Sequence, residues 1–333
     1  MRILLGIFLV SALVIPTRTL AGDLGPQAKV RVVPAPHGGR AAAAITAGGV
    51  IHLLYTSGEI PYYVKSSNDG ASFSAPLAVV DPASRHPGLT FTPMSMALGK
   101  GNSIYVAMIS NNWQRKLPNV PEGLIYASLA SGAPEFALIR SLNGRPSEGF
   151  SLAADAQGDV AATWLAEKLF ANFLRGGGKT FAPNTEINGT YLPCECCTTS
   201  AAYGANGDLA VLYRERTNNQ RDMHVIIIHP DGSKARTRIS STLWKIGACP
   251  MTYFMISPAA KGYVAAWPTK GDVYFARLDA HGQVLPPGEI KTPGHSGMRS
   301  AVIALSAPGG ESLVAWKHVD EVGWQIYDQQ GRP

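Results

Sequence analysis

The chain has 333 residues, a formal net charge of +6, 35 glycines, 24 prolines and only 16% charged residues. This turn-rich, weakly charged composition favours a β-rich domain with a large core over a helical bundle. The basic excess is spread along the chain and forms no dense Lys/Arg run, so we do not expect a nucleic-acid partner.

The N-terminus has the features of an export signal. A positive charge at Arg2 precedes a short apolar run that ends at Pro16, and small residues lie near Ala21. The run is short for a membrane-spanning helix. We therefore predict a signal peptide over 1–21, a mature chain over 22–333 without a membrane span, and a periplasmic or secreted location.

Six glycine-type turns, each followed by an apolar strand, repeat along the mature chain. They read "GGVIHLLYT", "GNSIYVAMIS", "QGDVAATWLA", "NGDLAVLYRE", "KGYVAAWPT" and "GESLVAWKH". A second series of strands, from "YYVKSSNDGASF" to "WQIYDQQGRP", enters further glycine turns at a similar interval. Glycine supplies the positive φ that tight hairpins need, so each unit predicts two hairpins.

The spacing of these units predicts the fold. A repeat of about 50 residues with four short strands is typical of a propeller blade. We therefore predict an all-β chain that forms a single six-bladed β-propeller domain with four-stranded antiparallel blades. An early strand over 28–36 is expected to pair with the last blade and close the ring.

The stretch "SSNDGASF" resembles the Asp-box hairpin of the sialidase-like (BNR-repeat) six-bladed propellers. Asn68 stands where the motif of that family usually has an aspartate. The resemblance implies a propeller over nearly the whole mature chain and a structural role for this hairpin, with no chemistry at the motif. The matching positions are Ser66, Asn68, Asp69, Gly70, Ser72 and Phe73.

Sialidases of that family hold a carboxylate with three arginines and use a tyrosine nucleophile beside a glutamate. Arg40 is a candidate for the first arginine, and Arg214 and Glu215 for the second arginine and the glutamate. Blade five begins with "ACPMTYF", which lacks the third arginine, and blade six begins with "HSGMRSAV", which lacks the tyrosine. We therefore expect a non-hydrolytic protein. A hydrolase acting on a glycan or another anionic ligand, with Asp222 added to these three residues, is the alternative.

Three of the four cysteines lie in "YLPCECCTTS", at Cys194, Cys196 and Cys197, and the fourth is Cys249. The repeats place the cluster and Cys249 just before the inner strands of blades four and five, so their sulfurs are expected to meet at one channel mouth. Thiolate and thioether ligands together select Cu(I). The sequence therefore predicts a soft-metal site, with copper as the expected metal, in which the four thiolates are joined by Met251 or a histidine.

Two other interpretations of the cysteines stay open. An even number of cysteines in an exported protein is typical of structural disulfides. A bridge between near neighbours in "CECC" would be strained, and strained disulfides are redox-active, so a redox pair is the other alternative. In the disulfide case, a protein-interaction scaffold without a small ligand is a further candidate function.

Other residues at the blade entrances and on the loop "RERTNNQRDMH" are predicted to support the site or to hold an anionic ligand or protein partner. For Arg221 and Asp222 the alternative is a salt bridge that stiffens the loop. The pattern C-x-C-C … YR … RDM … CPM also resembles a signature of secreted bacterial sialidase-like proteins, from which no activity is carried over. The supporting residues are His37, Tyr213, Arg214, Arg221, Asp222, Trp244, His295 and Met298.

Overall fold

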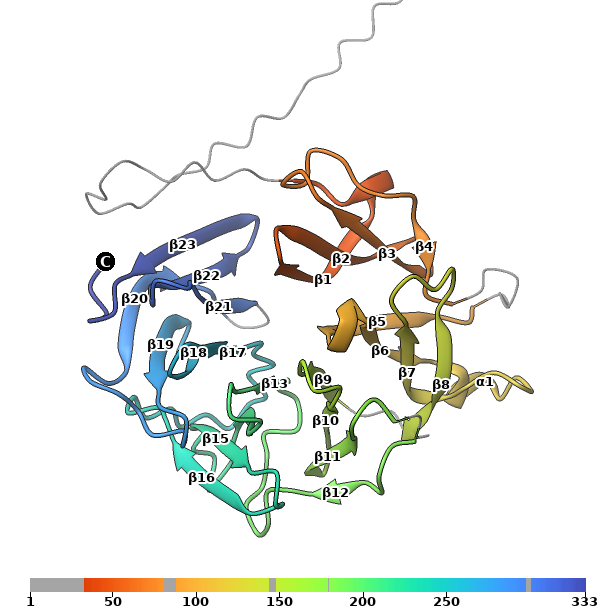
Figure 1. Ribbon diagram of the computed structural model, residues 1–333. Helices are drawn as coiled ribbons and strands as arrows, with labels where there is room; N and C mark the ends of the chain where they lie inside the picture. The colour runs from red at the N-terminus through yellow and green to blue at the C-terminus, as the bar shows by residue number, and fades with distance from the viewer. Residues whose placement is uncertain (1–32, 81–87, 144–147, 179, 298–300) are drawn as a thin grey trace, which may run out of the picture.

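In the computed structural model, the strands form six sheets arranged in a ring around a central axis (Figure 1). The sheets follow one another in chain order, so each sheet is one blade, and the last blade lies beside the first. The predicted six-bladed β-propeller is confirmed. The structure describes residues 33–80, 88–143, 148–178, 180–297 and 301–333.

The strands of each blade are consecutive in the chain and pair antiparallel. Blades one to three comprise β1 (Arg40–Ala47), β2 (Val50–Ser57), β3 (Ile60–Ser66), β4 (Leu77–Ala78), β5 (Phe91–Leu98), β6 (Ile104–Ser110), β7 (Gly123–Leu129), β8 (Ala137–Asn143), β9 (Glu148–Ala154), β10 (Val160–Ala166), β11 (Lys168–Leu174) and β12 (Thr185–Glu186). Blades four to six comprise β13 (Thr199–Tyr203), β14 (Leu209–Arg214), β15 (Met223–Ile228), β16 (Lys234–Arg238), β17 (Met255–Ala259), β18 (Gly262–Thr269), β19 (Asp272–Leu278), β20 (Ile290–His295), β21 (Val302–Ser306), β22 (Ser312–His318) and β23 (Glu321–Tyr327).

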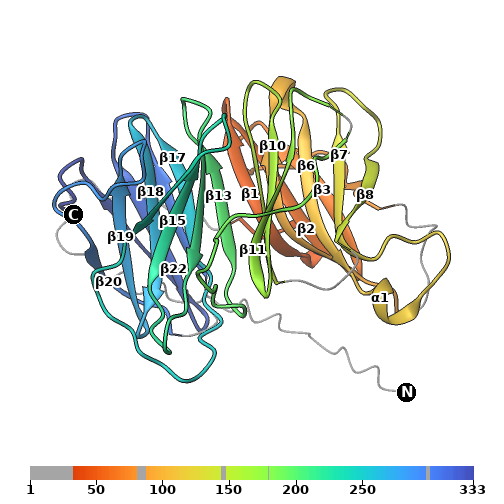
Figure 2. The same cartoon turned by 90° about the horizontal axis from the view of Figure 1, so that it is seen from below.

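Among the residues that the structure describes, helical structure is confined to single turns in connections. These are η1 (Pro36–Gly38), η3 (Lys100–Asn102) and α1 (Asn112–Arg115), of which α1 lies on the β6–β7 connection at the rim of the ring (Figure 2). The hairpins use the glycines that the repeats indicated. Gly48 and Gly49, between β1 and β2, have φ of 55° and 76°, which is the left-handed pair that a two-residue hairpin turn requires.

The cores lie between neighbouring blades, because alternate side chains of each strand point to opposite faces of its sheet. On β14, Leu212 packs toward Ile256 of blade five, whereas Val211 packs toward Leu169 of blade three. The same alternation carries on to the end of β14. It sends the side chain of Arg214 toward blade five and that of Tyr213 toward blade three.

The sixth blade differs from the expected four strands. Within the described residues it has three, β21 to β23, whereas each of the other blades has four. The predicted closing strand is described only from Val33 onward, where the chain has no regular structure before η1. The predicted signal peptide lies outside the described residues. None of the helices that the structure describes combines the length and apolar content needed to cross a membrane.

The turn that resembles an Asp-box is organised by Asn68. Ser66 Oγ donates to Asn68 Oδ1 at 2.8 Å, and the Gly70 amide donates to Ser66 Oγ at 2.9 Å. Asn68 Nδ2 donates to Ser72 Oγ at 2.8 Å, and the Ser72 amide donates back to Asn68 Oδ1 at 3.0 Å. These hydrogen bonds cross-link the β3–β4 connection through the amide side chain that stands in place of aspartate.

Candidate metal centre

The cysteine cluster lies in the connection that enters blade four, between β12 and β13. The backbone of this connection is held in place because the Cys194 amide donates to the Arg214 carbonyl at 2.7 Å. The Cys197 amide then donates to the Cys194 carbonyl at 2.9 Å and closes a tight turn. This turn places Cys194 and Cys197 in the apolar core between blades four and five, and leaves Cys196 half-buried at its edge.

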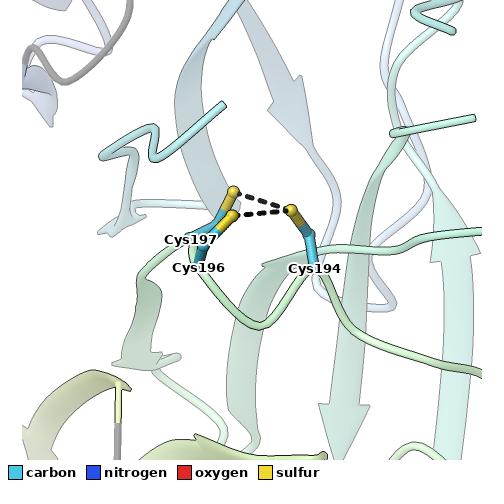
Figure 3. A group of neighbouring side chains, drawn as sticks. All are labelled: Cys194, Cys196 and Cys197. Atoms are coloured by element: carbon cyan, nitrogen blue, oxygen red, sulfur yellow. Dashed lines mark hydrogen bonds between the residues drawn. The ribbon is translucent and has the colours of Figure 1, made fainter. Parts of the chain in front are cut away.

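The three sulfurs of this turn are neighbours (Figure 3). The Sγ atoms of Cys194 and Cys197 lie 3.1 Å apart, and those of Cys194 and Cys196 lie 3.7 Å apart. All three atoms lie within 4.8 Å of one another. The turn thus gathers three soft donor atoms around one point at the entrance of blade four.

Cys249 joins the cluster from blade five. It forms a disulfide with Cys196, with their Cα atoms 6.2 Å apart, and its own side chain is exposed. The structure thus brings all four cysteines together, as the blade count predicted. It does so in a different chemical state from the predicted four thiolates, because Cys196 and Cys249 are bonded to each other while Cys194 and Cys197 are free.

Arg214 lies fully buried beside the sulfurs. Its Nη1 donates to the Arg221 carbonyl at 2.7 Å, its Nη2 to the Pro268 carbonyl at 2.5 Å, and its Nε to Thr252 Oγ1 at 3.3 Å. Its guanidinium also stacks 4.9 Å from the ring centroid of Trp244. These contacts fix a positive charge between blades four and five, where an anion would otherwise be poorly solvated.

Arg221 contributes a second buried cation. Its Nη1 donates to Cys194 Sγ at 3.0 Å, and its Nη2 donates to the Ala248 carbonyl at 3.3 Å. Its amide donates to the Trp244 carbonyl at 2.8 Å, which ties the β14–β15 connection to the loop that carries Cys249. The Arg221 Nε is buried and has no hydrogen-bond partner among the described residues.

The pKa values of the two free thiols are shifted in opposite directions. The hydrogen bond between the two sulfurs, helped by the charge of Arg214 and a contact with Thr252, lowers the pKa of Cys197 to about 6. The same hydrogen bond, together with burial, raises the pKa of Cys194 far above its ordinary value. The pair therefore holds one proton and one negative charge at neutral pH, and the negative charge on Cys197 is stabilised by Arg214.

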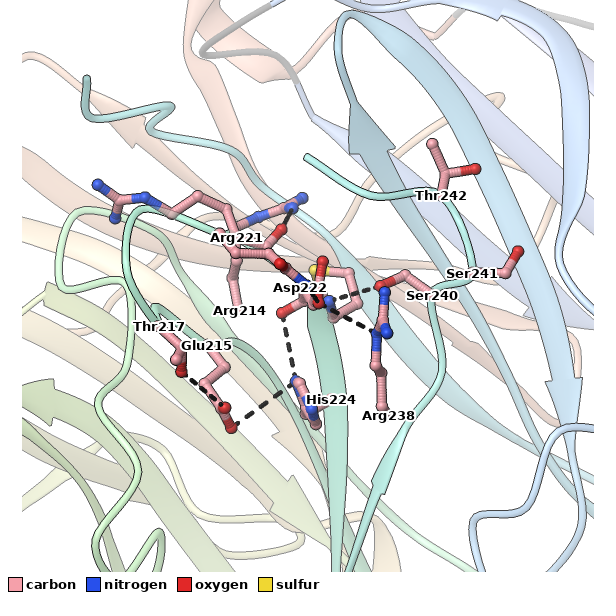
Figure 4. Close-up of polar contacts among 12 residues, drawn as sticks. Arg214, Glu215, Thr217, Arg221, Asp222, His224, Arg238, Ser240, Ser241 and Thr242 are labelled. Carbon is pink, nitrogen blue, oxygen red and sulfur yellow. Dashed lines mark hydrogen bonds and ion pairs between the residues drawn. The ribbon is translucent and has the colours of Figure 1, made fainter. Parts of the chain in front are cut away.

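Arg221 and Asp222 do not form the salt bridge considered as an alternative. Asp222 Oδ2 instead pairs with Arg238 Nε at 3.1 Å and accepts from Gln220 Nε2 at 2.5 Å (Figure 4). The Glu215 amide donates to the Asp222 carbonyl at 2.8 Å. Asp222 thus stabilises the loop, while its neighbour Arg221 turns toward the sulfurs.

A separate polar cluster lies on the opposite face of blade four. Tyr213 Oη donates to Glu215 Oε2 at 3.0 Å, and Arg236 Nη2 pairs with the same oxygen at 2.5 Å. The guanidinium of Arg236 stacks 3.6 Å from the ring centroid of the exposed Tyr191. His224 Nδ1 lies 3.8 Å from Glu215 Oε2.

Burial shifts the acidity of two residues of this cluster. Burial, followed by the charge of Glu215, raises the pKa of Tyr213. Burial lowers the pKa of His224 to about 4.

Several predicted residues lie away from the cysteines. His37 and Arg40 are exposed on blade one, which lies across the ring from blade four (Figure 1). Of the alternative hydrolytic set, Arg40 begins β1 of blade one, whereas Arg214 ends β14 of blade four and Glu215 and Asp222 follow in the β14–β15 connection. His295, on blade five, pairs with Asp272 at 3.3 Å. Met298 lies outside the described residues.

Met251, which was predicted as a further ligand, is half-buried, follows Cys249 by two positions and has a φ of 46°. Other parts of the site were not predicted from the sequence. Thr252 Oγ1 contacts both Cys197 Sγ, at 3.5 Å, and Arg214. Its position directly after "CPM" was the only signal for it. Arg236 was missed because it belongs to the next strand but one and meets Glu215 only through the sheet register.

No family model matches this sequence, and no curated protein matches it. Among solved structures, the chain is similar to a quinonprotein alcohol dehydrogenase-like protein from Bacteroides thetaiotaomicron, with 13% identity and a TM-score of 0.52. That match covers 88% of this chain but only 64% of the other protein. The major Malassezia sympodialis allergen Mala s 1 matches with 11% identity and a TM-score of 0.49, over 87% of each chain.

A sialidase is also among the structural neighbours. The NanB sialidase from Streptococcus pneumoniae matches with 15% identity and a TM-score of 0.42, over 69% of this chain and 35% of that enzyme. At such low identities the likeness shows the propeller fold alone. The chemistry of this chain must therefore be argued from its own residues.

Proposed function

We propose that this propeller is an exported, non-hydrolytic protein that binds a soft metal ion, Cu(I), at its cysteine cluster. Cys194 and Cys197 supply two thiolates, and Cys196 supplies a third when its bond to Cys249 is reduced. The observation that carries the proposal is the set of three Sγ atoms within 4.8 Å of one another at the entrance of blade four.

The sulfur spacing suits a single ion. With metal–sulfur bonds of about 2.3 Å, two thiolates on one ion lie at most roughly 4.6 Å apart. The separation of 3.7 Å between the sulfurs of Cys194 and Cys196 lies within this limit, and so does the 3.1 Å between those of Cys194 and Cys197. Binding would therefore require side-chain adjustments within the turn and no movement of the blades.

The charge around the sulfurs favours a monovalent metal. Cu(I) with two or three thiolates forms a complex with a net negative charge. Arg214 and Arg221 place two buried positive charges beside it. A buried charge is stable only when it is paired, so the arginines stabilise an anionic copper–thiolate complex more than a neutral complex of a divalent ion with two thiolates. Soft sulfur donors also select Cu(I) over harder ions.

Two features support an exported location. The N-terminal 1–21 has the composition of a cleaved signal peptide. The Cys196–Cys249 disulfide is a bond that forms in oxidising compartments such as the periplasm. In such a compartment the number of thiolates available to copper depends on the state of this disulfide.

The test is a Cu(I) titration of the mature protein, reduced with a phosphine under anaerobic conditions and competed against a coloured Cu(I) chelator. We expect one Cu(I) per chain. Replacing both free cysteines, with Cys194→Ser and Cys197→Ser together, should weaken binding by about a hundredfold or more, since the loss of ligands exceeds the effect of losing outer contacts.

The matched control is Tyr213→Phe, which alters a buried side chain on the opposite face of blade four and should leave Cu(I) affinity unchanged. Equal copper binding by the wild type and the double cysteine variant would contradict the proposal. So would stoichiometric Zn²⁺ binding that excess Cu(I) fails to displace, because the site would then not be selective for a soft monovalent ion.

A further inference from the structure

The four cysteines form two pairs with different access to solvent. Cys194 and Cys197 have the C-x-x-C spacing, are free, and are 0% and 2% exposed. Cys196 and Cys249 form a disulfide whose Cys249 side is exposed. A molecule in solution can therefore touch the disulfide but not the dithiol behind it.

The two pairs are in contact through one sulfur. Cys194 Sγ lies 3.7 Å from Cys196 Sγ on one side and 3.1 Å from Cys197 Sγ on the other. Thiol–disulfide exchange proceeds by attack of a thiolate on a disulfide sulfur, and reacting atoms held close together need no diffusional encounter. Cys194 is thus placed to attack Cys196 and then to be attacked by Cys197.

We propose that the cluster is a disulfide relay, in which the buried dithiol reduces external disulfides through the surface pair. In the first step Cys194 passes its proton to the Cys197 thiolate, whose sulfur lies 3.1 Å away, and attacks Cys196 Sγ as a thiolate. A Cys194–Cys196 bond forms, the Cys196–Cys249 bond breaks, and Cys249 leaves as a thiolate. This inference is independent of metal binding.

In the second step Cys197 gives this one proton, through solvent, to the exposed Cys249 thiolate and attacks Cys194 Sγ as a thiolate. A Cys194–Cys197 bond forms, the Cys194–Cys196 bond breaks, and Cys196 leaves as a thiolate. Two electrons have then moved from the buried pair to the surface pair without any outside oxidant. The exposed Cys249 thiol is now the reactive group.

The co-reactant is a disulfide on a small molecule or an exposed protein segment. Cys249 attacks one of its sulfurs and releases one thiol. Cys196 then attacks Cys249 Sγ, releases the second thiol and restores the Cys196–Cys249 bond. The net change is the reduction of one external disulfide and the oxidation of Cys194 and Cys197 to a disulfide.

The test treats the native, metal-free full chain with N-ethylmaleimide in the presence of a Cu(I) chelator, and maps labels and disulfides by mass spectrometry. We expect the label on Cys249 and Cys196, together with a new Cys194–Cys197 disulfide. A label on Cys194 or Cys197 with the Cys196–Cys249 bond intact would overturn the relay, and so would a protein that takes up no label.

A variant adds a second measurement. Cys194→Ser removes the attacking sulfur and should slow the labelling of Cys249 by at least about tenfold, whereas Tyr213→Phe should leave it unchanged. An unchanged rate in Cys194→Ser would also overturn the relay. Because the assay contains no metal, its failure would leave the Cu(I) proposal intact, and failure of the Cu(I) titration would leave the relay intact.

Discussion

Arg221 places a guanidinium nitrogen 3.0 Å from the sulfur of Cys194, in a position where neither group is exposed to solvent. A cation at this distance stabilises the thiolate form of the Cys194–Cys197 pair relative to the neutral form. Since the two thiols share a proton, the contact affects the acidity of the pair as a unit.

Replacing this cation should raise the pH at which the pair ionises. The charge of Arg221 lowers the pKa of Cys194, which is coupled to Cys197, so the ionisation of the pair should move to higher pH in Arg221→Met. The ultraviolet absorbance of the thiolate, followed against pH, measures it. Arg238→Met is the matched control, because it removes the same charge from the partner of Asp222, away from the sulfurs. A titration curve unchanged in Arg221→Met would refute the assignment.

The Cys196–Cys249 disulfide should stabilise the propeller. It joins blades four and five across a sequence separation of 53 residues, so it restricts the unfolded chain. We expect Cys249→Ser to lower the free energy of unfolding by about 2–4 kcal/mol. Guanidinium unfolding measures the change. The reduced wild type should have the same free energy of unfolding as Cys249→Ser. The variant Cys194→Ser leaves the disulfide in place and should lose less free energy of unfolding.

The blade count could be predicted from the sequence because its signals are local. A glycine turn such as Gly48–Gly49 and the alternation along β14 each depend on a few neighbouring residues. The meeting of Cys249 with the cluster was predicted for the same reason, since both precede inner strands in adjacent repeats. Within the described residues the sixth blade has three strands, and the segment predicted to pair with it, 28–36, lies mostly outside them.

The pairing within the cluster could not be predicted. Which sulfur meets Cys249 depends on the direction of each side chain in the turn. That direction is set by hydrogen bonds from the Cys194 amide to the distant Arg214 carbonyl and from the Cys197 amide to the Cys194 carbonyl. The partners of Arg221 and Asp222 could not be predicted either. The two side chains point to opposite sides of the loop, and Asp222 meets Arg238 only because β15 pairs with β16.

The phenol of Tyr213 should contribute to stability without affecting the sulfurs. It donates to Glu215 Oε2 at 3.0 Å and accepts from Arg236 Nε at 3.2 Å. Tyr213→Phe removes both bonds and leaves the buried carboxylate with fewer donors, at a cost of about 1–2 kcal/mol. Urea unfolding measures the loss. If the thiolate titration also changed, the two faces of blade four would be coupled and the variant could not serve as a control.

His224 should make the protein less stable in acid. Burial lowers its pKa from 6.5 to about 4, so between these values the unfolded chain binds a proton that the folded chain does not. The free energy of unfolding should therefore fall as the pH drops from about 6.5 to 4, by roughly 3 kcal/mol from this residue. Urea unfolding over this range should give a flatter pH dependence for His224→Gln than for the wild type. The Cys197 thiolate also loses its charge in acid, but it does so in both proteins, so its effect cancels in the comparison.

If His224→Gln does not fold, NMR of the His224 ring in the wild type provides the test. A ring that is already protonated at pH 6 would refute the prediction.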